Sequence, residues 1–79
     1  MNEKIRVIQY GLGPIGCATA GLVAERNNLE LVGAVDIDPA KVGKDVAEVI
    51  GLDSPLGIEV RPRLADTGTS ADVVLHTTN

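Results

Sequence analysis

A glycine-rich motif near the N-terminus separates an apolar segment from a segment with helical periodicity. The motif has the pattern G-x-G-x-x-G and consists of Gly11, Leu12, Gly13, Pro14, Ile15 and Gly16. Residues 4–9 before it are rich in β-branched side chains and predict a strand, and the apolar residues over 14–26 recur at the spacing of a helix. In such a turn, glycines permit a tight bend, a close approach of a diphosphate to the backbone, and close packing of the helix on the sheet. The motif therefore predicts a strand, an anion-binding loop and a helix whose N-terminus faces the anion.

The remaining segments predict three more strands and a second helix. We expect the first helix to end at Asn27 and Asn28, because asparagine tolerates the left-handed conformation that closes a helix. Asp38 before Pro39 predicts the N-cap of the second helix, and Gly51 predicts its end. The predicted ranges are a strand over 29–35, a helix over 39–50, a strand over 58–61, an irregular segment or one weak helical turn over 62–70, and a last strand over 71–76.

This order of strands and helices is typical of an α/β fold with a doubly wound parallel sheet. The chain is rich in valine and has no Phe or Trp, which favours strands that are buried on both faces. With 79 residues, the chain is about half the usual size of a domain. Its last strand would lie beside the first strand and would need a neighbour on its far side. We therefore expect residues 1–79 to be part of a dinucleotide-binding domain within a longer protein.

Two further positions fit dinucleotide binding. Asp36 lies 20 residues after Gly16, at the carboxyl end of a predicted strand, where an acid can accept hydrogen bonds from the adenosine ribose. Its charge favours NAD as the cofactor, with NADP possible. His76, Thr77 and Thr78 follow the last strand, at the edge where open α/β sheets bind ligands, and are predicted to contact the diphosphate or the nicotinamide ribose. The alternatives are that the glycines only form a turn, that Thr77 and Thr78 cap a turn, and that His76 packs at the strand end.

The charge and the cysteine content exclude several classes of protein. Seven Lys and Arg against eleven Asp and Glu give a net charge of −4, which excludes a basic surface for nucleic acid or for an anionic membrane. The single cysteine, Cys17, excludes disulfides and cysteine-ligated zinc and is interpreted as a packing residue, and one histidine implies no metal site. No segment is apolar over the length of a signal peptide or a membrane span, so we expect a cytoplasmic protein. Lys41, Lys44, Arg61 and Arg63 either surround the adenosine end or are solvated.

A resemblance to a known family is carried by three segments, IRVIQYGLGPIG, LVGAVDIDPAKVGKDVAEVIGL and ADVVLHTTN. They resemble the N-terminal NAD(P)-binding domain of the dihydrodipicolinate reductase-like dehydrogenases, and they are most similar to 2,4-diaminopentanoate dehydrogenase and the related NAD(P)-dependent amine dehydrogenases. The resemblance implies a Rossmann domain followed by an α+β domain for substrate binding and oligomerisation. It also implies that residues 11–16 form the phosphate loop, that Asp36 contacts the adenosine ribose, and that residues 76–78 lie near the nicotinamide.

The reaction implied by this resemblance interconverts an amine with a ketone or imine plus ammonia, by hydride transfer between the substrate and NAD(P). No catalytic residue is implied within this chain, because the residues for substrate binding and proton transfer would lie beyond Asn79. The full-length protein is expected to form a homo-oligomer. Two alternatives stay open: a 4-hydroxy-tetrahydrodipicolinate reductase of lysine biosynthesis, and a non-catalytic domain that senses NAD(P).

Overall fold

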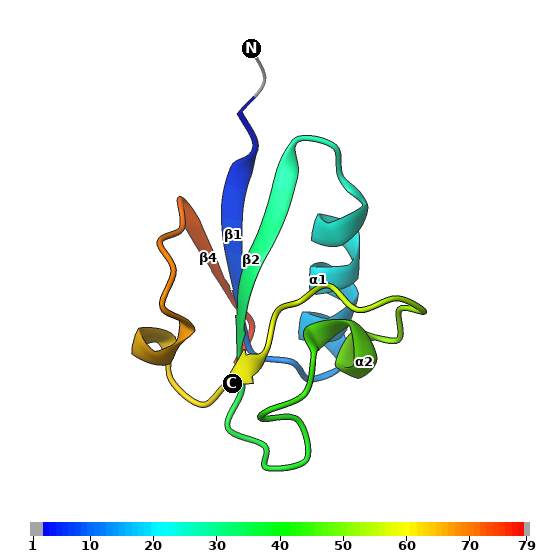
Figure 1. The fold of residues 1–79 in the computed structure, drawn as a ribbon, viewed down its shortest axis with the longest axis vertical. Helices are drawn as coiled ribbons and strands as arrows, with labels where there is room; N and C mark the ends of the chain where they lie inside the picture. Colours follow the sequence, from blue (N-terminus) through cyan, green and yellow to red (C-terminus); the bar gives the residue numbers. More distant parts are fainter. Residues whose placement is uncertain (1–2, 79) are drawn as a thin grey trace.

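The computed structural model describes residues 3–78 of the chain (Figure 1). Residues 1, 2 and 79, which belong to the predicted domain 1–79, lie outside the described part. The elements in chain order are β1 (Ile5–Tyr10), α1 (Pro14–Glu25), β2 (Leu29–Val35), α2 (Val46–Ile50), β3 (Val60–Arg61), the 3₁₀ helix η1 (Leu64–Thr67) and β4 (Val73–His76). No helix in this described part has the length and hydropathy needed to cross a bilayer.

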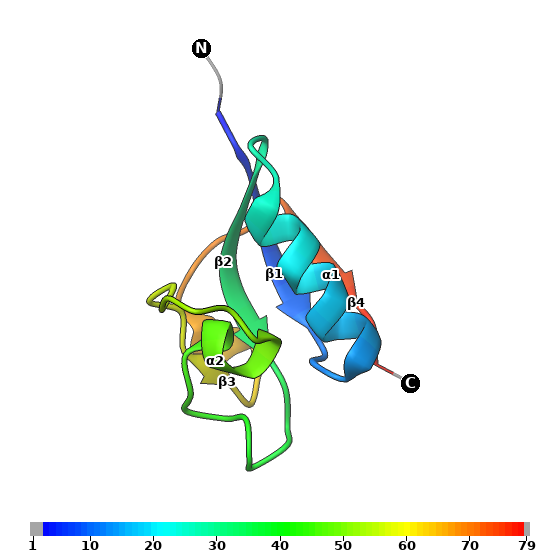
Figure 2. The same cartoon turned by 90° about the vertical axis from the view of Figure 1, so that its right-hand side faces the viewer.

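Four strands form one sheet in the order β3-β2-β1-β4, and each neighbouring pair is parallel. Val7 of β1, for example, lies in register with Leu31 of β2 on one side and with Val73 of β4 on the other. This is the order of the first four strands of a Rossmann fold, so the predicted α/β fold with a parallel sheet is confirmed. The helices α1 and α2 lie on one side of the sheet, and η1 lies on the other side (Figure 1). Figure 2 looks onto the side that carries the two helices.

The core lies between the sheet and these two helices. It consists of small and branched apolar side chains, namely Val7, Leu12, Ala20, Val23, Leu31, Ala34, Val46 and Val60. Full burial of one valine or leucine side chain stabilises a fold by about 1.5–3 kcal/mol. Leu12 comes from the loop before α1 and is fully buried, so the glycine motif is anchored in the core.

The helix α1 begins as predicted and ends differently. Pro14 is its first residue, where the missing N–H of proline costs no hydrogen bond. After the helix, Arg26 adopts an extended conformation (φ −80°, ψ 138°). The expected left-handed closure at Asn27 and Asn28 is wrong, because every positive φ in the described part belongs to a glycine. The turn is held to the sheet instead, since the Asn28 carbonyl accepts a hydrogen bond from Ile5 N (3.0 Å).

The predicted start of the second helix is also wrong. Residues 39–44 form turns, although the Asp38 side chain accepts a backbone hydrogen bond as a helix-capping residue does. The chain leaves the helical path at Gly43, whose φ is +90° and whose N–H donates to the Val60 carbonyl (2.9 Å). Val60 N in turn donates to the Lys44 carbonyl (2.8 Å). Backbone pairing with β3 therefore delays the start of the helix.

Asp45 is the N-cap of α2. Its Oδ1 accepts hydrogen bonds from Ala47 N (2.9 Å) and Leu56 N (3.0 Å), and its Oδ2 accepts one from Gly57 N (2.7 Å). The helix stops before Gly51, as predicted, and this glycine adopts the left-handed conformation (φ +86°). The strands β3 and β4 are shorter than predicted, and the predicted weak helical turn is η1.

Asp45 should make the stability of the protein depend on pH. Hydrogen bonds from the backbone N–H groups of Leu56 and Ala47 hold the pKa of Asp45 below its ordinary value. A carboxyl group whose pKa is lower in the folded state stabilises the fold above its unfolded-state pKa of about 3.9, and this contribution is lost as the pH falls through the folded-state pKa. We expect Asp45→Ala to lower the unfolding temperature at neutral pH, and the difference from wild type to shrink below about pH 4.

Thermal unfolding of the full-length protein at a series of pH values measures this effect. The matched control is Asp53→Ala, which removes the same charge from the exposed loop after α2 and leaves the hydrogen bonds of Asp45 in place. A difference between wild type and Asp45→Ala that does not change with pH would contradict the prediction.

Candidate dinucleotide-binding site

The glycine loop joins the carboxyl end of β1 to the start of α1. Gly11 N donates to the Val35 carbonyl at the end of β2 (2.8 Å), and Gly11 has a φ of +105°, which favours glycine. A Cβ on Gly16 would overlap the Gly11 carbonyl oxygen. The missing side chain at Gly16 therefore lets α1 come close to the loop at the carboxyl end of β1.

Gly13 is the N-cap of α1 and faces open space. Its φ of −71° is accessible to any residue, and a Cβ built on it meets no heavy atom within 4 Å beyond its chain neighbours. Within residues 3–78, no side chain caps this helix and no acid lies in its first turn. The first N–H groups of a helix have no partner within the helix and together carry about half a positive charge. An anion can reach them over Gly13, next to the exposed side chain of Ile15, and this arrangement fits the diphosphate of a dinucleotide.

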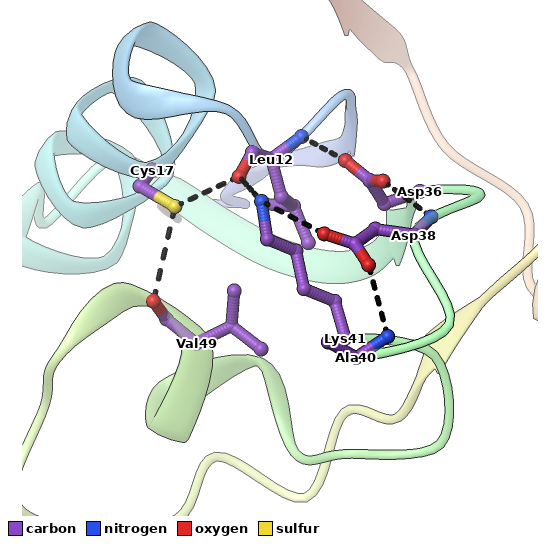
Figure 3. Close-up of polar contacts among 7 residues, drawn as sticks. All are labelled: Leu12, Cys17, Asp36, Asp38, Ala40, Lys41 and Val49. Carbon is purple, nitrogen blue, oxygen red and sulfur yellow. Dashed lines mark hydrogen bonds and ion pairs between the residues drawn. The ribbon is translucent and has the colours of Figure 1, made fainter.

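Leu12 is held by side chains from three other segments (Figure 3). Its N–H donates to Asp36 Oδ2 (2.7 Å), and its carbonyl accepts hydrogen bonds from Lys41 Nζ (2.6 Å) and Cys17 Sγ (3.2 Å). Cys17 also lies 3.8 Å from the Val49 carbonyl oxygen, so it packs between α1 and α2. The second residue of the glycine motif is thus fixed through its backbone as well as through its buried side chain.

Asp36 follows β2 and lies beside the glycine loop, where the sequence predicted it. Its Oδ1 accepts a hydrogen bond from Asp38 N (2.8 Å), while its Oδ2 binds Leu12 N. Burial works against the charged form of Asp36, but the N–H groups of Asp38 and Leu12 and the nearby Lys41 ammonium outweigh it and hold the pKa of Asp36 below its ordinary value. A carboxylate oxygen has two lone pairs, so both oxygens keep the capacity to accept a ribose hydroxyl.

Lys41 places a positive charge beside Asp36. Its Nζ lies 2.6 Å from the Leu12 carbonyl oxygen and 3.9 Å from Asp38 Oδ2, and its side chain is 29% exposed. The other basic candidates pair with acids or are exposed: Arg61 with Glu59 (3.4 Å), Arg63 with Asp66 (3.0 Å), and Lys44. Lys41 is therefore the basic candidate that the structure brings to the glycine loop.

The segment after β4 packs on the glycine loop. Thr77 N donates to the Tyr10 carbonyl (2.9 Å), and the Thr77 hydroxyl donates to the Gly11 carbonyl (3.2 Å). A Cβ on Gly11 would lie 2.9 Å from Thr78 Cγ2. His76 is exposed and contacts Tyr10 edge-on, with ring centroids 4.8 Å apart, and its Nε2 lies 2.7 Å from Thr78 Oγ1. The structure thus brings Thr77 and Thr78 against the predicted phosphate loop, and it turns His76 toward β1.

One residue of this arrangement, Gln9, was missed by sequence reasoning. Gln9 is fully buried at the end of β1, and its Nε2 donates to the Gly11 carbonyl (3.0 Å) and to the Thr77 hydroxyl (3.0 Å). The available signal was a single amide side chain in an apolar strand that runs directly into the glycine motif. Buried polar side chains are generally hydrogen-bonded, so a glutamine here should have a hydrogen-bond partner. The local sequence does not show which residue that partner is.

A family model described as the N-terminus of dihydrodipicolinate reductase matches residues 5–79. The chain belongs to this family. The predicted resemblance to the N-terminal NAD(P)-binding domain of the dihydrodipicolinate reductase-like proteins is thereby confirmed. The parallel sheet with its glycine loop is the fold of a nicotinamide-dinucleotide-binding domain of this family.

Members of the dihydrodipicolinate reductase family match most of the chain. A 4-hydroxy-tetrahydrodipicolinate reductase from Synechocystis sp. is 40% identical over 60 residues, which are 76% of this chain and 20% of the relative. A reductase of the same name from Nostoc sp. is 33% identical over 58 residues, which are 73% of this chain and 21% of the relative. The structure of an amine dehydrogenase from Mycobacterium smegmatis has a TM-score of 0.83 at 31% identity, over 91% of this chain and 22% of that chain. The chain therefore spans about a fifth of the length of the proteins that it matches.

The same substitution at two glycines of α1 should have opposite effects on stability. Gly16→Ala places a Cβ on the Gly11 carbonyl oxygen and forces the loop and the helix apart, and overpacking of this kind costs about 1–3 kcal/mol. Gly21→Ala adds a Cβ in open space, and alanine in place of a helical glycine stabilises by about 0.5–1 kcal/mol. Chemical denaturation of both variants in the full-length protein gives the two free energies of unfolding. Equal stability of the two variants would contradict the close contact at Gly16.

Proposed function

We propose that this chain is the cofactor-binding part of an NAD(P)-dependent oxidoreductase that acts on amines, by oxidative deamination or the reverse reductive amination. One observation carries the cofactor half of this proposal. The uncapped N-terminus of α1 and the carboxylate of Asp36 lie side by side and are joined through the Leu12 N–H. A site for an anion and an acceptor for ribose hydroxyls therefore flank a single residue of the glycine loop.

Each part of the cofactor has a proposed contact in this arrangement. The diphosphate binds the N–H groups in the first turn of α1, where Gly13 leaves room for it. The adenosine ribose donates hydrogen bonds to Asp36, and residues 76–78 lie toward the nicotinamide half. When bound, the nicotinamide supplies or accepts the hydride. Residues outside this chain bind the substrate and transfer the proton.

The amine substrate is supported by the similarity to the amine dehydrogenase structure. A second candidate is supported by sequence, since the relatives at 40% and 33% identity are 4-hydroxy-tetrahydrodipicolinate reductases. A non-catalytic domain that senses NAD(P) would use the same cofactor site. The substrate is therefore what separates the three candidates.

Turnover by the full-length protein distinguishes them. With small ketones, ammonia, a proton and NAD(P)H, an amine dehydrogenase forms the amine, water and NAD(P)⁺, so the absorbance of the reduced cofactor falls only when ketone and ammonia are both present. A reductase of the second kind consumes NAD(P)H with 4-hydroxy-tetrahydrodipicolinate and needs no ammonia. Cofactor binding without turnover of either substrate class would favour the sensing domain.

Gly13→Val should abolish dinucleotide binding while the protein stays folded. The branched side chain fills the space over the first turn of α1 through which the diphosphate approaches, and its Cβ meets no other part of the described chain. Titration of NADH fluorescence measures the affinity, and circular dichroism checks the fold. Gly21→Ala, on the same helix but away from the loop, is the control and should keep the wild-type affinity. Unchanged affinity in a folded Gly13→Val variant would remove the phosphate-loop assignment.

Asp36 should make NAD the preferred cofactor. Hydrogen bonds from Leu12 N and Asp38 N keep its carboxylate in place, so the 2′-phosphate of NADP meets a fixed negative charge. Two like charges about 4 Å apart near a protein surface repel by up to about 4 kcal/mol. The Lys41 ammonium beside Asp36 opposes this repulsion, so we expect a preference for NAD without exclusion of NADP.

Asp36→Ser should shift the ratio of the two kcat/KM values toward NADP by about tenfold, or about 1.4 kcal/mol. Asp36→Asn is the matched variant, since it keeps the shape of the side chain and one acceptor oxygen and removes the charge. Steady-state kinetics of the full-length protein with both cofactors give the ratio, in which a general loss of activity cancels. If wild type already favours NADP, or if neither variant moves the ratio, the discriminating contact lies elsewhere in the adenosine pocket.

A further inference from the structure

Gln9 links the two loops from which the proposed cofactor site is built. Its Nε2 donates to the Gly11 carbonyl (3.0 Å) and to the Thr77 hydroxyl (3.0 Å), and the Thr77 hydroxyl donates to the same carbonyl (3.2 Å). Gly11 begins the glycine loop, and Thr77 begins the segment after β4. One buried amide therefore ties together two segments that are 66 residues apart in the sequence.

The orientation of the Gln9 amide is fixed by these partners. Both partner atoms are oxygens, and one of them is a carbonyl oxygen that cannot donate, so the amide nitrogen has to face them. Gln9 Oε1 is then buried with no hydrogen-bond partner among the residues that the structure describes. An unpartnered buried oxygen lowers the stability of a fold, and an apolar side chain of similar size would avoid this cost. This cost is about as large as the stability that the two Nε2 hydrogen bonds contribute, so the amide adds little net stability to the fold.

The peptide between Gly11 and Leu12 transmits the effect of Gln9 to Asp36. Every peptide bond in the described part is trans, so the C=O and the N–H of this peptide point in opposite directions. The Gly11 carbonyl faces Gln9 and Thr77, and the Leu12 N–H faces Asp36 Oδ2 (2.7 Å). Fixing the carbonyl fixes the peptide plane, and with it the hydrogen bond that holds the proposed ribose acid.

We propose that Gln9 is a positioning residue for the dinucleotide. It acts on Asp36 through the Gly11–Leu12 peptide, and on the segment after β4 through Thr77. This inference rests on the proposed function, because it takes these groups to contact the cofactor. Gln9 itself is fully buried and does not touch the cofactor. Without its two donors the peptide plane can rotate, and the cofactor has to restore the orientation as it binds, which lowers the affinity.

NADH affinity in variants of the full-length protein tests this role. Gln9→Leu removes both donors at similar volume, and Thr77→Val removes the hydroxyl at the same shape. We expect Gln9→Leu to weaken NADH binding by about tenfold, the effect of roughly one hydrogen bond, with little change in the unfolding temperature of the cofactor-free protein. Thr77→Val should weaken NADH binding to a similar extent and also lower the unfolding temperature, because it leaves one of the two Gln9 Nε2 donors without an acceptor. Because both side chains act on the Gly11 carbonyl, the double variant should bind NADH about as weakly as Gln9→Leu alone, and not about a hundredfold more weakly than wild type.

Gln9→Glu supplies a pH-dependent readout that packing alone would not produce. A protonated carboxyl group can donate to the Gly11 carbonyl and an ionised one cannot, and burial raises the pKa of a glutamate above its ordinary value of about 4.3. The NADH affinity of this variant, relative to wild type, should be highest at low pH, where one of the two donors is restored, and fall as the introduced carboxyl ionises. The other ionisable groups near the loop are the same in both proteins, namely Tyr10, Cys17, Asp36, Asp38, Lys41 and His76. Asn27→Asp, in an exposed turn, is the charge-matched control and should follow the wild-type profile.

The outcomes separate the role of Gln9 from the proposed function. Failure of wild type to bind NADH contradicts the proposed function itself. If wild type binds NADH and Gln9→Leu binds it with the same affinity, the role of Gln9 is overturned and the proposed function is not. The role of Gln9 is also overturned if the NADH affinity of Gln9→Glu falls only at those pH values at which the unfolding temperature of that variant falls. If Gln9→Leu does not fold, the pH profile of Gln9→Glu decides, because its protonated form retains a donor.

Discussion

The carbonyl oxygen of Gly11 is the point on which the described site converges. Gly16, at the start of α1, comes so close that any Cβ there would overlap this oxygen. Gln9 and Thr77 both donate hydrogen bonds to it, and the N–H at the other end of the same peptide faces Asp36. The orientation of one peptide thus sets how closely α1 approaches β1, how the segment after β4 is held, and where the acid after β2 lies.

The site combines opposite electrostatic features within one acidic chain. The net charge is −4, yet no acid lies in the first turn of α1, so the partial positive charge of the helix N-terminus is left for an anion. Immediately before that helix, the backbone N–H of Leu12 binds the carboxylate of Asp36, and Lys41 adds a positive charge to the same cluster. The proposed contacts with a diphosphate and a ribose need these opposite partners, and the glycine loop brings them within one residue of each other.

The features that the sequence predicted correctly have local causes or follow from parallel topology, although the local prediction of a left-handed closure at Asn27 and Asn28 was wrong. The glycine spacing constrains the backbone within a few residues, and the parallel crossover brings Asp36 to the same sheet edge as the loop. The predicted start of α2 was wrong because both Asp38 and Asp45 can cap a helix in that segment. The choice depends on backbone pairing with Val60, which no local pattern encodes. Gln9 was missed for the same reason, since its partner Thr77 lies 68 residues further along the chain.

The late start of α2 shapes the proposed adenosine end of the site. A helix beginning at Pro39 would hold Lys41 in its first turn, where the positive end of the helix dipole disfavours a cation. Residues 39–44 form turns and no continuous helix, so this dipole is smaller, and the Lys41 ammonium reaches the Leu12 carbonyl beside Asp36. The pairing of this segment with β3 therefore determines where a positive charge lies next to Asp36, the proposed ribose acid. A change in β3 that weakens the pairing would move this charge, and we expect it to alter the proposed preference between NAD and NADP and to remove one of the hydrogen bonds that hold Leu12 in the glycine loop.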